Sequence, residues 1–272
     1  HLIDVKDDGS FRMNMEYFYY CQGLTMTNEK FNKLFGGPPR EPETNLTQKE
    51  MDIARSLQEV TEEIVLKIGN HVYKETGLKN LCLAGGVALN CVANGRLLRE
   101  GPFENIWIQP AAGDAGGALG AALIGWYKYH NNPRTADEKT DSQKGSYLGP
   151  EFDENEIYTF IQSHSLNAKK YNDDELIETV ANLIDSEKVI GWFDGKMEFG
   201  PRALGSRTII GDARSPKMQA TMNIKIKFRE GFRPFAPSVL YEKVSDFFEV
   251  EKASPYMLLT ADVKKERRIP MT

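Results

Sequence analysis

The first half of the sequence repeats one pattern twice: a short apolar run, a glycine-rich turn and a stretch with helical periodicity. The first apolar run, residues 81–84, ends at Gly85-Gly86, and the second, residues 106–108, leads to Gly113-Asp114-Ala115-Gly116-Gly117. Strand, glycine turn and helix in repeated succession are typical of layered α/β folds. We therefore expect an α/β architecture for residues 1–130.

A long helix is expected ahead of the first turn. Thr47-Gln48-Lys49-Glu50 has the form of a capping box, and Gly77 is a suitable helix stop. Apolar residues between them recur at three- and four-residue steps, which predicts one buried helix face: Ile53, Leu57, Val60, Ile64, Ile68 and Val72.

Residues 131–146 have Ala136 as their only apolar residue, which predicts an exposed linker. The chain after it has the mixture of short strands and helices expected of an α+β unit. We expect helices at 154–163, 174–185 and near 218–223, and a buried strand at 189–193 that ends in an Asp194-Gly195 turn.

Composition excludes several classes of protein. Of the 272 residues 40% are hydrophobic and the net charge is −5, a balance typical of a globular protein and not of a general polyanion binder. No apolar run is long enough for a transmembrane helix. Cys21, Cys82 and Cys91 form no CxxC pair, so we expect buried free thiols in a reducing cytoplasm. The four histidines lack metal-ligand spacing, so we expect no zinc site built from this chain alone.

The segment from Lys196 to Arg233 carries nine basic and three acidic residues, a local charge of +6. Its arginines alternate with glycine, proline and phenylalanine, as in residues 198–205 and 231–237. A guanidinium held in one direction by such a backbone suits bidentate binding of phosphate or carboxylate. A solvated basic surface and an RNA-binding surface are the alternatives. The phenylalanines favour a partly buried anion pocket, and no aromatic RNP pattern supports RNA.

Local chemistry leaves two interpretations for each glycine turn. Gly85-Gly86-Val87 would let the backbone approach a phosphate at a helix N-terminus, or it is a turn that needs glycine for packing alone. Asp114 would present oxygens to a metal ion or a ligand hydroxyl, or it caps the following helix, which is the commoner role.

Four motifs in this order resemble the ATP-dependent carbamoyltransferases of the nodulation-factor, cephamycin and aminoglycoside type. They are residues 83–91, 113–120, 198–207 and 229–237, and the resemblance extends over nearly the whole chain. That family pairs a Kae1-like domain of the actin/Hsp70/sugar-kinase fold with a YrdC-like α+β domain. The resemblance implies the second half of a Kae1-like domain in residues 1–130, a linker at 131–146 and an incomplete YrdC-like domain in 147–272.

The resemblance also implies a two-step reaction. In the YrdC-like domain carbamoyl phosphate reacts with ATP, which releases pyrophosphate and forms carbamoyl adenylate. In the Kae1-like domain the carbamoyl group passes to the hydroxyl of a small-molecule acceptor, assisted by an iron-type metal ion, while Mg²⁺ accompanies ATP. Neither nucleic acid nor a membrane is an expected partner.

Motif positions assign these roles to particular residues. By resemblance, carbamoyl phosphate is held by Arg202, Lys227 and Arg233. The nucleotide contacts the turn formed by Gly85, Gly86, Val87 and Asn90, and Asp114 is the carboxylate ligand of the metal ion.

Two departures limit what is expected of this chain. It lacks the family's metal-binding histidine pair and the base that activates the acceptor, and its last residues, 267–272, stop before further basic residues of the adenylation pocket. We therefore expect an interior fragment without complete carbamoyl transfer. A kinase-like or chaperone-like nucleotide-binding protein, a related hydrogenase- or tRNA-carbamoylation system and a non-catalytic binding module are the alternatives.

Overall fold

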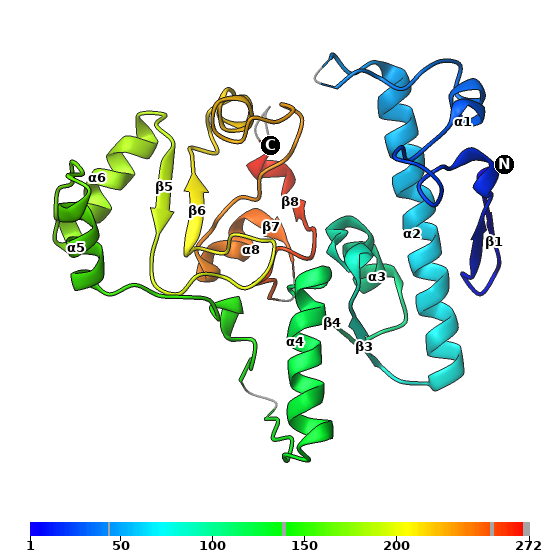
Figure 1. Cartoon of the computed structure of the whole chain (residues 1–272), viewed down its shortest axis with the longest axis horizontal. Helices are drawn as coiled ribbons and strands as arrows, with labels where there is room; N and C mark the ends of the chain where they lie inside the picture. Colours follow the sequence, from blue (N-terminus) through cyan, green and yellow to red (C-terminus); the bar gives the residue numbers. More distant parts are fainter. Residues whose placement is uncertain (43, 138–139, 251–252, 269–272) are drawn as a thin grey trace. The chain divides into compact units, whose positions relative to one another are not determined.

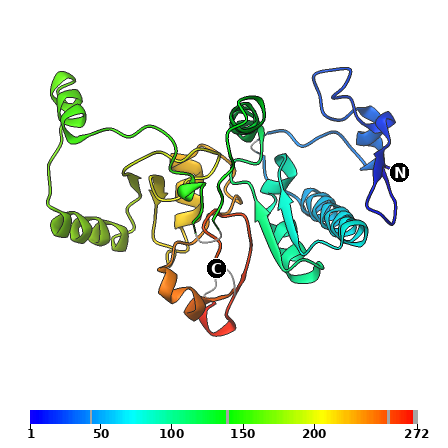
Figure 2. The ribbon, with the colours of Figure 1, turned by 90° about the horizontal axis from the view of Figure 1, so that it is seen from below.

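A computed structural model gives the fold of the chain and describes residues 1–42, 44–137, 140–250 and 253–268. It is a mixed α/β structure with more helix than strand (Figures 1 and 2). The chain divides into two compact units, one of residues 1–82 and 90–107, the other of residues 83–89 and 108–272.

The first unit begins with a β-hairpin and contains the longest helix of Figure 1. Strands β1 (Ile3–Val5) and β2 (Phe11–Met13) pair antiparallel, with Ile3 opposite Met13. Further elements are helices α1 (Glu29–Leu34), α2 (Gln48–Thr76) and α3 (Cys91–Glu100). The predicted capping box of Thr47 and Glu50 is confirmed, and Gly77, at φ +64°, ends α2 as predicted.

Strands β3 (Asn80–Leu83) and β4 (Asn105–Ile108), both predicted from the sequence, pair with each other in a two-stranded sheet. Asn105 N–H donates to Lys79 O, and Gln109 N–H donates to Leu83 O. The two bonds advance together along the chain, so the strands run parallel and each opens into its glycine turn at the same end.

Helix α2 buries another face more deeply than the predicted one. Of the predicted residues, four are half-buried, whereas Leu57 is 68% and Ile68 41% exposed, and Glu62, on the other face, is only 3% exposed. The reason is the packing of α2 on α3: Arg96 of α3 reaches the Glu62 carboxylate at 2.8 Å, and a Cβ on the buried Gly69 would lie 2.7 Å from Leu97 Cδ1. The hydrogen bond from Arg96 lowers the pKa of Glu62 and outweighs the opposing effect of burial.

The second unit contains α4 (Asp114–Ile124), which continues into a π-helical turn to Tyr129, α5 (Glu154–Ser163) and α6 (Asp173–Asp185). Strands β5 (Ile190–Phe193) and β6 (Arg207–Ile210) pair antiparallel. Helices α7 (Met218–Thr221) and α8 (Val244–Phe247) and the antiparallel strands β7 (Phe248–Glu249) and β8 (Asp262–Val263) follow. The helices predicted at 154–163 and 174–185 and near 218 are confirmed, as is the strand at 190–193. That strand is not buried, since Phe193 is 54% exposed.

The predicted linker, whose residues 138–139 lie outside the described chain, is not exposed throughout. Ser146 is 1% exposed, and its carbonyl accepts a hydrogen bond from Phe199 N–H at 2.7 Å. The Tyr256 hydroxyl binds the Asp141 carboxylate, and burial together with this partner raises the pKa of Tyr256. The end of the segment is therefore part of the interior of the second unit. A domain boundary at 131–146 stays a prediction.

The three cysteines are free thiols, but the predicted burial is wrong for Cys21 and Cys82, which are exposed. Cys82 lies on β3 between Leu81 and Leu83, and side chains alternate across a strand, so the two leucines turn inward and the thiol outward. Within the described residues, no helix has both the length and the apolar character needed to cross a bilayer.

Candidate functional site

The glycine turn after β3 leaves free space around its backbone. Gly85 has φ +100°, a conformation that favours glycine over residues with a Cβ. A Cβ built on Gly85 or Gly86 meets no other atom within 4 Å, and Val87 is 62% exposed. A ligand phosphate could therefore approach this backbone closely, as a nucleotide-binding turn requires.

The turn after β4 is hydrogen-bonded to the first one. Gly85 N–H donates to Ala112 O at 2.8 Å, and Gly85 O accepts from Ala88 N–H at 2.9 Å. Ala111 and Ala112 are buried, at 1% and 5% exposure. The two motif turns therefore form one backbone assembly over a core of small side chains.

Asp114 is the first residue of α4, and Gly113 occupies the N-cap position. The alternative role of Asp114 as the helix cap is therefore wrong. Its carboxylate is exposed and lies in the first turn, where the helix dipole favours a negative charge.

The loop between β5 and β6 is closed on one buried carboxylate, Glu198, whose side chain is 0% exposed. Its Oε1 accepts from the backbone N–H groups of Leu204 at 2.6 Å, Ser206 at 2.8 Å and Arg207 at 3.4 Å. Its Oε2 accepts from Arg207 Nε at 3.2 Å, and Arg207 Nη2 donates in turn to Gly200 O at 2.5 Å. Both arms of the loop are thus joined through Glu198 and Arg207.

Burial acts to raise the pKa of Glu198, but the backbone hydrogen bonds from Leu204, Ser206 and Arg207 together outweigh it. The net pKa lies below its ordinary value because these donors stabilise the charged form. Glu198 is therefore an anion at neutral pH, and its lone pairs face the loop itself.

This loop meets the first glycine turn at Arg202 and the second at Gly200. Arg202 Nη2 donates to Leu89 O, at the end of the first turn, at 3.3 Å. Gly200, at φ +129°, lies so close to the second turn that a Cβ there would be 3.4 Å from Ala111 Cβ. Three sequence motifs therefore converge within the second unit.

Arg202 Nε is buried and has no hydrogen-bond partner, the one such side-chain atom found among the described residues. A buried donor without a partner is costly, and functional sites are a common reason for one. A guanidinium is suited to fork-like binding of phosphate or carboxylate oxygens. The arrangement at Arg202 can therefore receive an anion.

The second basic motif is organised by another buried polar residue, Asn223, which is 0% exposed. Its amide nitrogen donates to Gly231 O at 3.1 Å and to Arg233 O at 2.8 Å, and its oxygen accepts from Arg229 Nε at 2.6 Å. Arg229 also stacks on the Phe235 ring at 5.0 Å. The backbone that carries Arg233 is therefore fixed, and the guanidinium of Arg229 is already engaged.

The structure does not join all three predicted carbamoyl phosphate residues. Lys227 is exposed, and its side chain has no hydrogen-bond or ion-pair partner in the described part of the chain. Arg233 lies 4.0 Å from the Glu230 carboxylate and is 53% exposed. No interaction between described residues links either of them to Arg202.

Asn90, predicted to contact the nucleotide, lies in the first unit, where its side chain caps α3 and binds Gln58. Its side-chain oxygen accepts from Ala93 N–H at 3.1 Å as the N-cap of α3, and its amide group exchanges hydrogen bonds with Gln58 of α2. Its polar atoms are therefore occupied within the fold.

A metal ion of the kind that the resemblance implies would need several ligands. Within the ranges that the structure describes, no group of three or more His, Cys, Asp or Glu side chains could hold one. Asp114 can supply a single carboxylate, so these residues do not fit a complete metal site by themselves.

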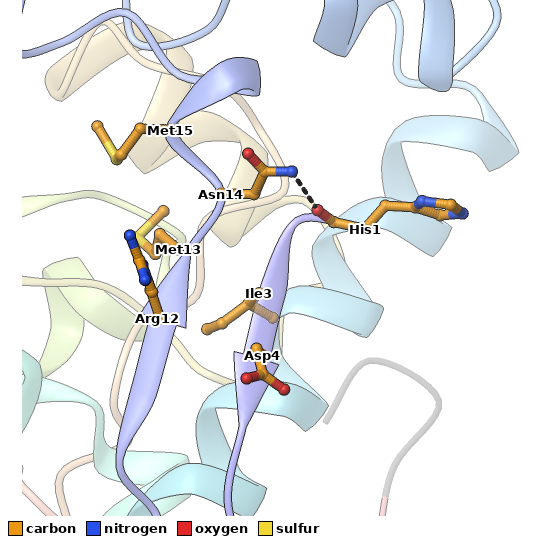
Figure 3. Close-up of a pocket in the computed structure, with 7 residues that line it drawn as sticks. All are labelled: His1, Ile3, Asp4, Arg12, Met13, Asn14 and Met15. Atoms are coloured by element: carbon orange, nitrogen blue, oxygen red, sulfur yellow. Dashed lines mark hydrogen bonds between the residues drawn. The ribbon is translucent and has the colours of Figure 1, made fainter.

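A surface pocket is present on the N-terminal hairpin of the first unit (Figure 3). Asn14 Nδ2 donates to His1 O at 3.2 Å across its upper end, and Arg12 and Asp4 line it from the two strands. No predicted site residue lines this pocket. A second, open pocket lies along α5, and no residue of the three motifs lines it.

Two organising residues, Glu198 and Asn223, were missed as site residues by sequence reasoning. The available signals were a single acidic residue in the basic motif of residues 198–207, and an asparagine between the apolar residues Met222 and Ile224. In contrast, two of the basic residues of this segment are already paired with carboxylates of the chain: Arg207 binds Glu198, and the exposed Arg214 binds Asp212 at 2.8 Å and Asp185 at 2.6 Å.

Comparison with known proteins agrees with the order of the motifs. Residues 1–123 match the family model described as carbamoyltransferase N-terminus, and residues 181–272 match the one described as carbamoyltransferase C-terminus. The uncharacterized protein sll1178 of Synechocystis sp. is 61% identical over 274 residues, which cover 100% of this chain and 44% of that protein.

Two relatives carry nodulation names. Nodulation protein NolO of Bradyrhizobium diazoefficiens is 41% identical over 224 residues, 81% of this chain and 40% of that protein. Nodulation protein U of Rhizobium fredii is 34% identical over 195 residues, 69% of this chain and 29% of that protein. The chain thus spans less than half the length of these relatives. With both family models matched in the expected order, the chain belongs to the carbamoyltransferase family.

Proposed function

We propose that the chain is part of an ATP-dependent carbamoyltransferase that forms carbamoyl adenylate and passes the carbamoyl group to the hydroxyl of a small-molecule acceptor. Membership of the family supports transfer of a carbamoyl group. Within this proposal, residues 1–130 belong to a Kae1-like domain and residues 147–272 to a YrdC-like domain. The protein would act in the cytoplasm without nucleic acid or membrane as partner.

One observation carries the proposal: the buried, unpartnered Nε of Arg202 at the meeting point of three family motifs. An unsatisfied buried donor costs about 1–3 kcal/mol, and a bound phosphate oxygen would remove that cost. The guanidinium would also neutralise negative charge that develops at phosphorus.

The proposed reaction has an adenylation step and a transfer step. Carbamoyl phosphate gives inorganic phosphate and carbamate with water, a carbamate oxygen attacks the α-phosphorus of ATP, and pyrophosphate leaves. The acceptor oxygen then attacks the carbamoyl carbon, AMP leaves, and the hydroxyl proton is released. Arg202, Lys227 and Arg233 would hold the anionic groups of the first step.

The nucleotide would contact the turn of Gly85, Gly86 and Val87, where a Cβ on either glycine would meet no other atom within 4 Å. ATP would arrive with Mg²⁺. Asp114 would contribute one ligand to an iron-type ion, whose remaining ligands are not supplied by the described residues. We do not expect this chain by itself to complete carbamoyl transfer.

Titration calorimetry with carbamoyl phosphate tests the anion site. We expect Arg202→Ala to weaken binding by about tenfold to a hundredfold, since a hydrogen bond to a charged group is lost. Arg134→Ala is the matched control, because Arg134 is an exposed arginine of the same unit. Equal affinities for the wild type and Arg202→Ala would rule out this site.

Exchange of pyrophosphate into ATP, with and without carbamoyl phosphate, tests the adenylation step. Exchange that needs carbamoyl phosphate and falls in Arg202→Ala supports the proposal. ATP hydrolysis or sugar phosphorylation that is indifferent to carbamoyl phosphate would instead support a kinase-like nucleotide-binding protein.

A further inference from the structure

Glu198 has an unusual place for a carboxylate beside an anion site. Its side chain is fully buried in a segment of net charge +6, four residues before Arg202. A free carboxylate there would repel a phosphate, so its charge has to be balanced within the protein. The three backbone N–H groups and Arg207 Nε provide that balance.

These bonds tie the outgoing arm of the loop to its returning arm. Glu198 reaches residues 204–207, and Gly200 O is tied to Arg207. Arg202 lies in the segment enclosed by these cross-links, and its direction therefore depends on the loop conformation they impose. The outgoing arm is anchored from its other side, because Phe199 N–H donates to Ser146 O at 2.7 Å and Gly149 N–H donates to Met197 O at 2.9 Å.

Glu198 itself has no role as ligand or base. Its Oε1 accepts three hydrogen bonds and its Oε2 is occupied by Arg207. A proton-transfer group must reach its substrate, which this buried carboxylate cannot do.

We infer that Glu198 is a positioning residue for anion binding, which holds the loop of residues 198–207 so that the Arg202 guanidinium faces the phosphate-bearing substrate. The inference rests on the proposed function of Arg202. Glu198 determines the affinity for the anion without touching it. In its absence the backbone N–H groups and Arg207 lose their shared acceptor, and Arg202 is no longer held in one orientation.

The test is a double-mutant cycle on the affinity for inorganic phosphate, measured by titration calorimetry on the full chain. The variants are Glu198→Gln, Arg202→Ala and the double variant, with Glu178→Gln, an exposed carboxylate of α6, as matched control. We expect Glu198→Gln to weaken binding about tenfold and to have no further effect when Arg202 is already alanine. A loss of affinity that is equal in both backgrounds would show that Glu198 acts independently of Arg202 and would overturn the inference.

The cycle separates the two proposals. If Arg202→Ala binds phosphate as tightly as the wild type, or if the wild type does not bind it, the proposed function fails and the inference fails with it. If Arg202→Ala loses affinity but a folded Glu198→Gln does not, only the positioning role is wrong.

A second variant covers the case in which Glu198→Gln does not fold. Glu198→Asp keeps the charge but draws the carboxylate back by one methylene, so we expect a folded chain with an intermediate loss of affinity. Amide NMR signals of Leu204 and Ser206 report the loop directly, and we expect them to move in Glu198→Asp. A folded Glu198→Asp with unchanged affinity and unchanged amide signals would contradict the inference as well.

Discussion

At the scale of single residues, the Glu198 carboxylate links stability to pH. Its pKa is lower in the folded chain than its ordinary value of 4.5, so its contribution is fully present above pH 4.5 and is lost as the pH falls through the folded-state pKa. We expect Glu198→Gln to lower the free energy of unfolding by about 2–3 kcal/mol at pH 7, and by less as the pH falls below 4.5. Urea unfolding between pH 3 and pH 7 measures this. A pH-independent difference would contradict it.

Asn223 gives a second prediction of the same kind. Asn223→Ala removes the donor to Gly231 O and Arg233 O and the acceptor of Arg229 Nε. We expect the free energy of unfolding to fall by about 2–4 kcal/mol, because buried polar groups lose their partners. Urea unfolding is the measurement, and Asn155→Ala, an exposed asparagine of α5, is the control that we expect to stay within about 0.5 kcal/mol of the wild type.

Sequence reasoning reached Arg202 but not the residue that holds its loop. The hydrogen bond of Glu198 to Ser206 spans eight residues and exists because Gly200 and Gly205 both take positive φ values. Hydrophobic periodicity in the sequence cannot predict a contact that depends on the geometry of two glycine turns. For the same reason a count of basic residues could not separate Arg202 from Arg214, which is paired internally.

At the scale of elements, two helical glycines lead to opposite predictions. A Cβ at Gly69 of α2 would press on the buried Leu97, whereas a Cβ at Gly120 of α4 meets no atom within 4 Å. We expect Gly120→Ala to raise the free energy of unfolding by about 0.5–1 kcal/mol, as helix propensity dictates. We expect Gly69→Ala to lower it by about 1 kcal/mol, because overpacking exceeds that gain. Thermal and urea unfolding measure both, and a gain at Gly69 would show that α2 and α3 pack more loosely than the structure has them.

The elements themselves were largely predictable because their signals are local. A capping box, a terminal glycine and regular apolar spacing located α2, and short apolar runs before glycine turns located β3 and β4. The buried face of α2 was not predictable, since it depends on where α3 presents Arg96 and Leu97. The burial of Ser146 was not predictable either, because the surrounding sequence is polar.

At the scale of the whole molecule, charge is unevenly distributed: the net charge is −5, yet residues 196–233 carry +6. Affinity for phosphate should therefore fall as salt rises from 0.05 to 0.5 M, because salt screens exposed charges such as Lys227. The ratio between the wild type and Arg202→Ala should change less, since Arg202 is partly buried and less screened. Calorimetry at several salt concentrations gives both quantities, and a ratio that collapses with salt would place Arg202 among the exposed cations.

The cross-links of the 198–207 loop have a consequence for the speed of binding. The loop is already closed by its own carboxylate before any ligand arrives, so little chain has to be ordered on association. We expect phosphate binding to follow a single exponential without a slow rearrangement phase. Its observed rate constant should rise linearly with phosphate concentration. Glu198→Gln, which removes these cross-links, should introduce such a slow phase. The rate of binding, as well as the affinity, would then depend on the conformation of the loop.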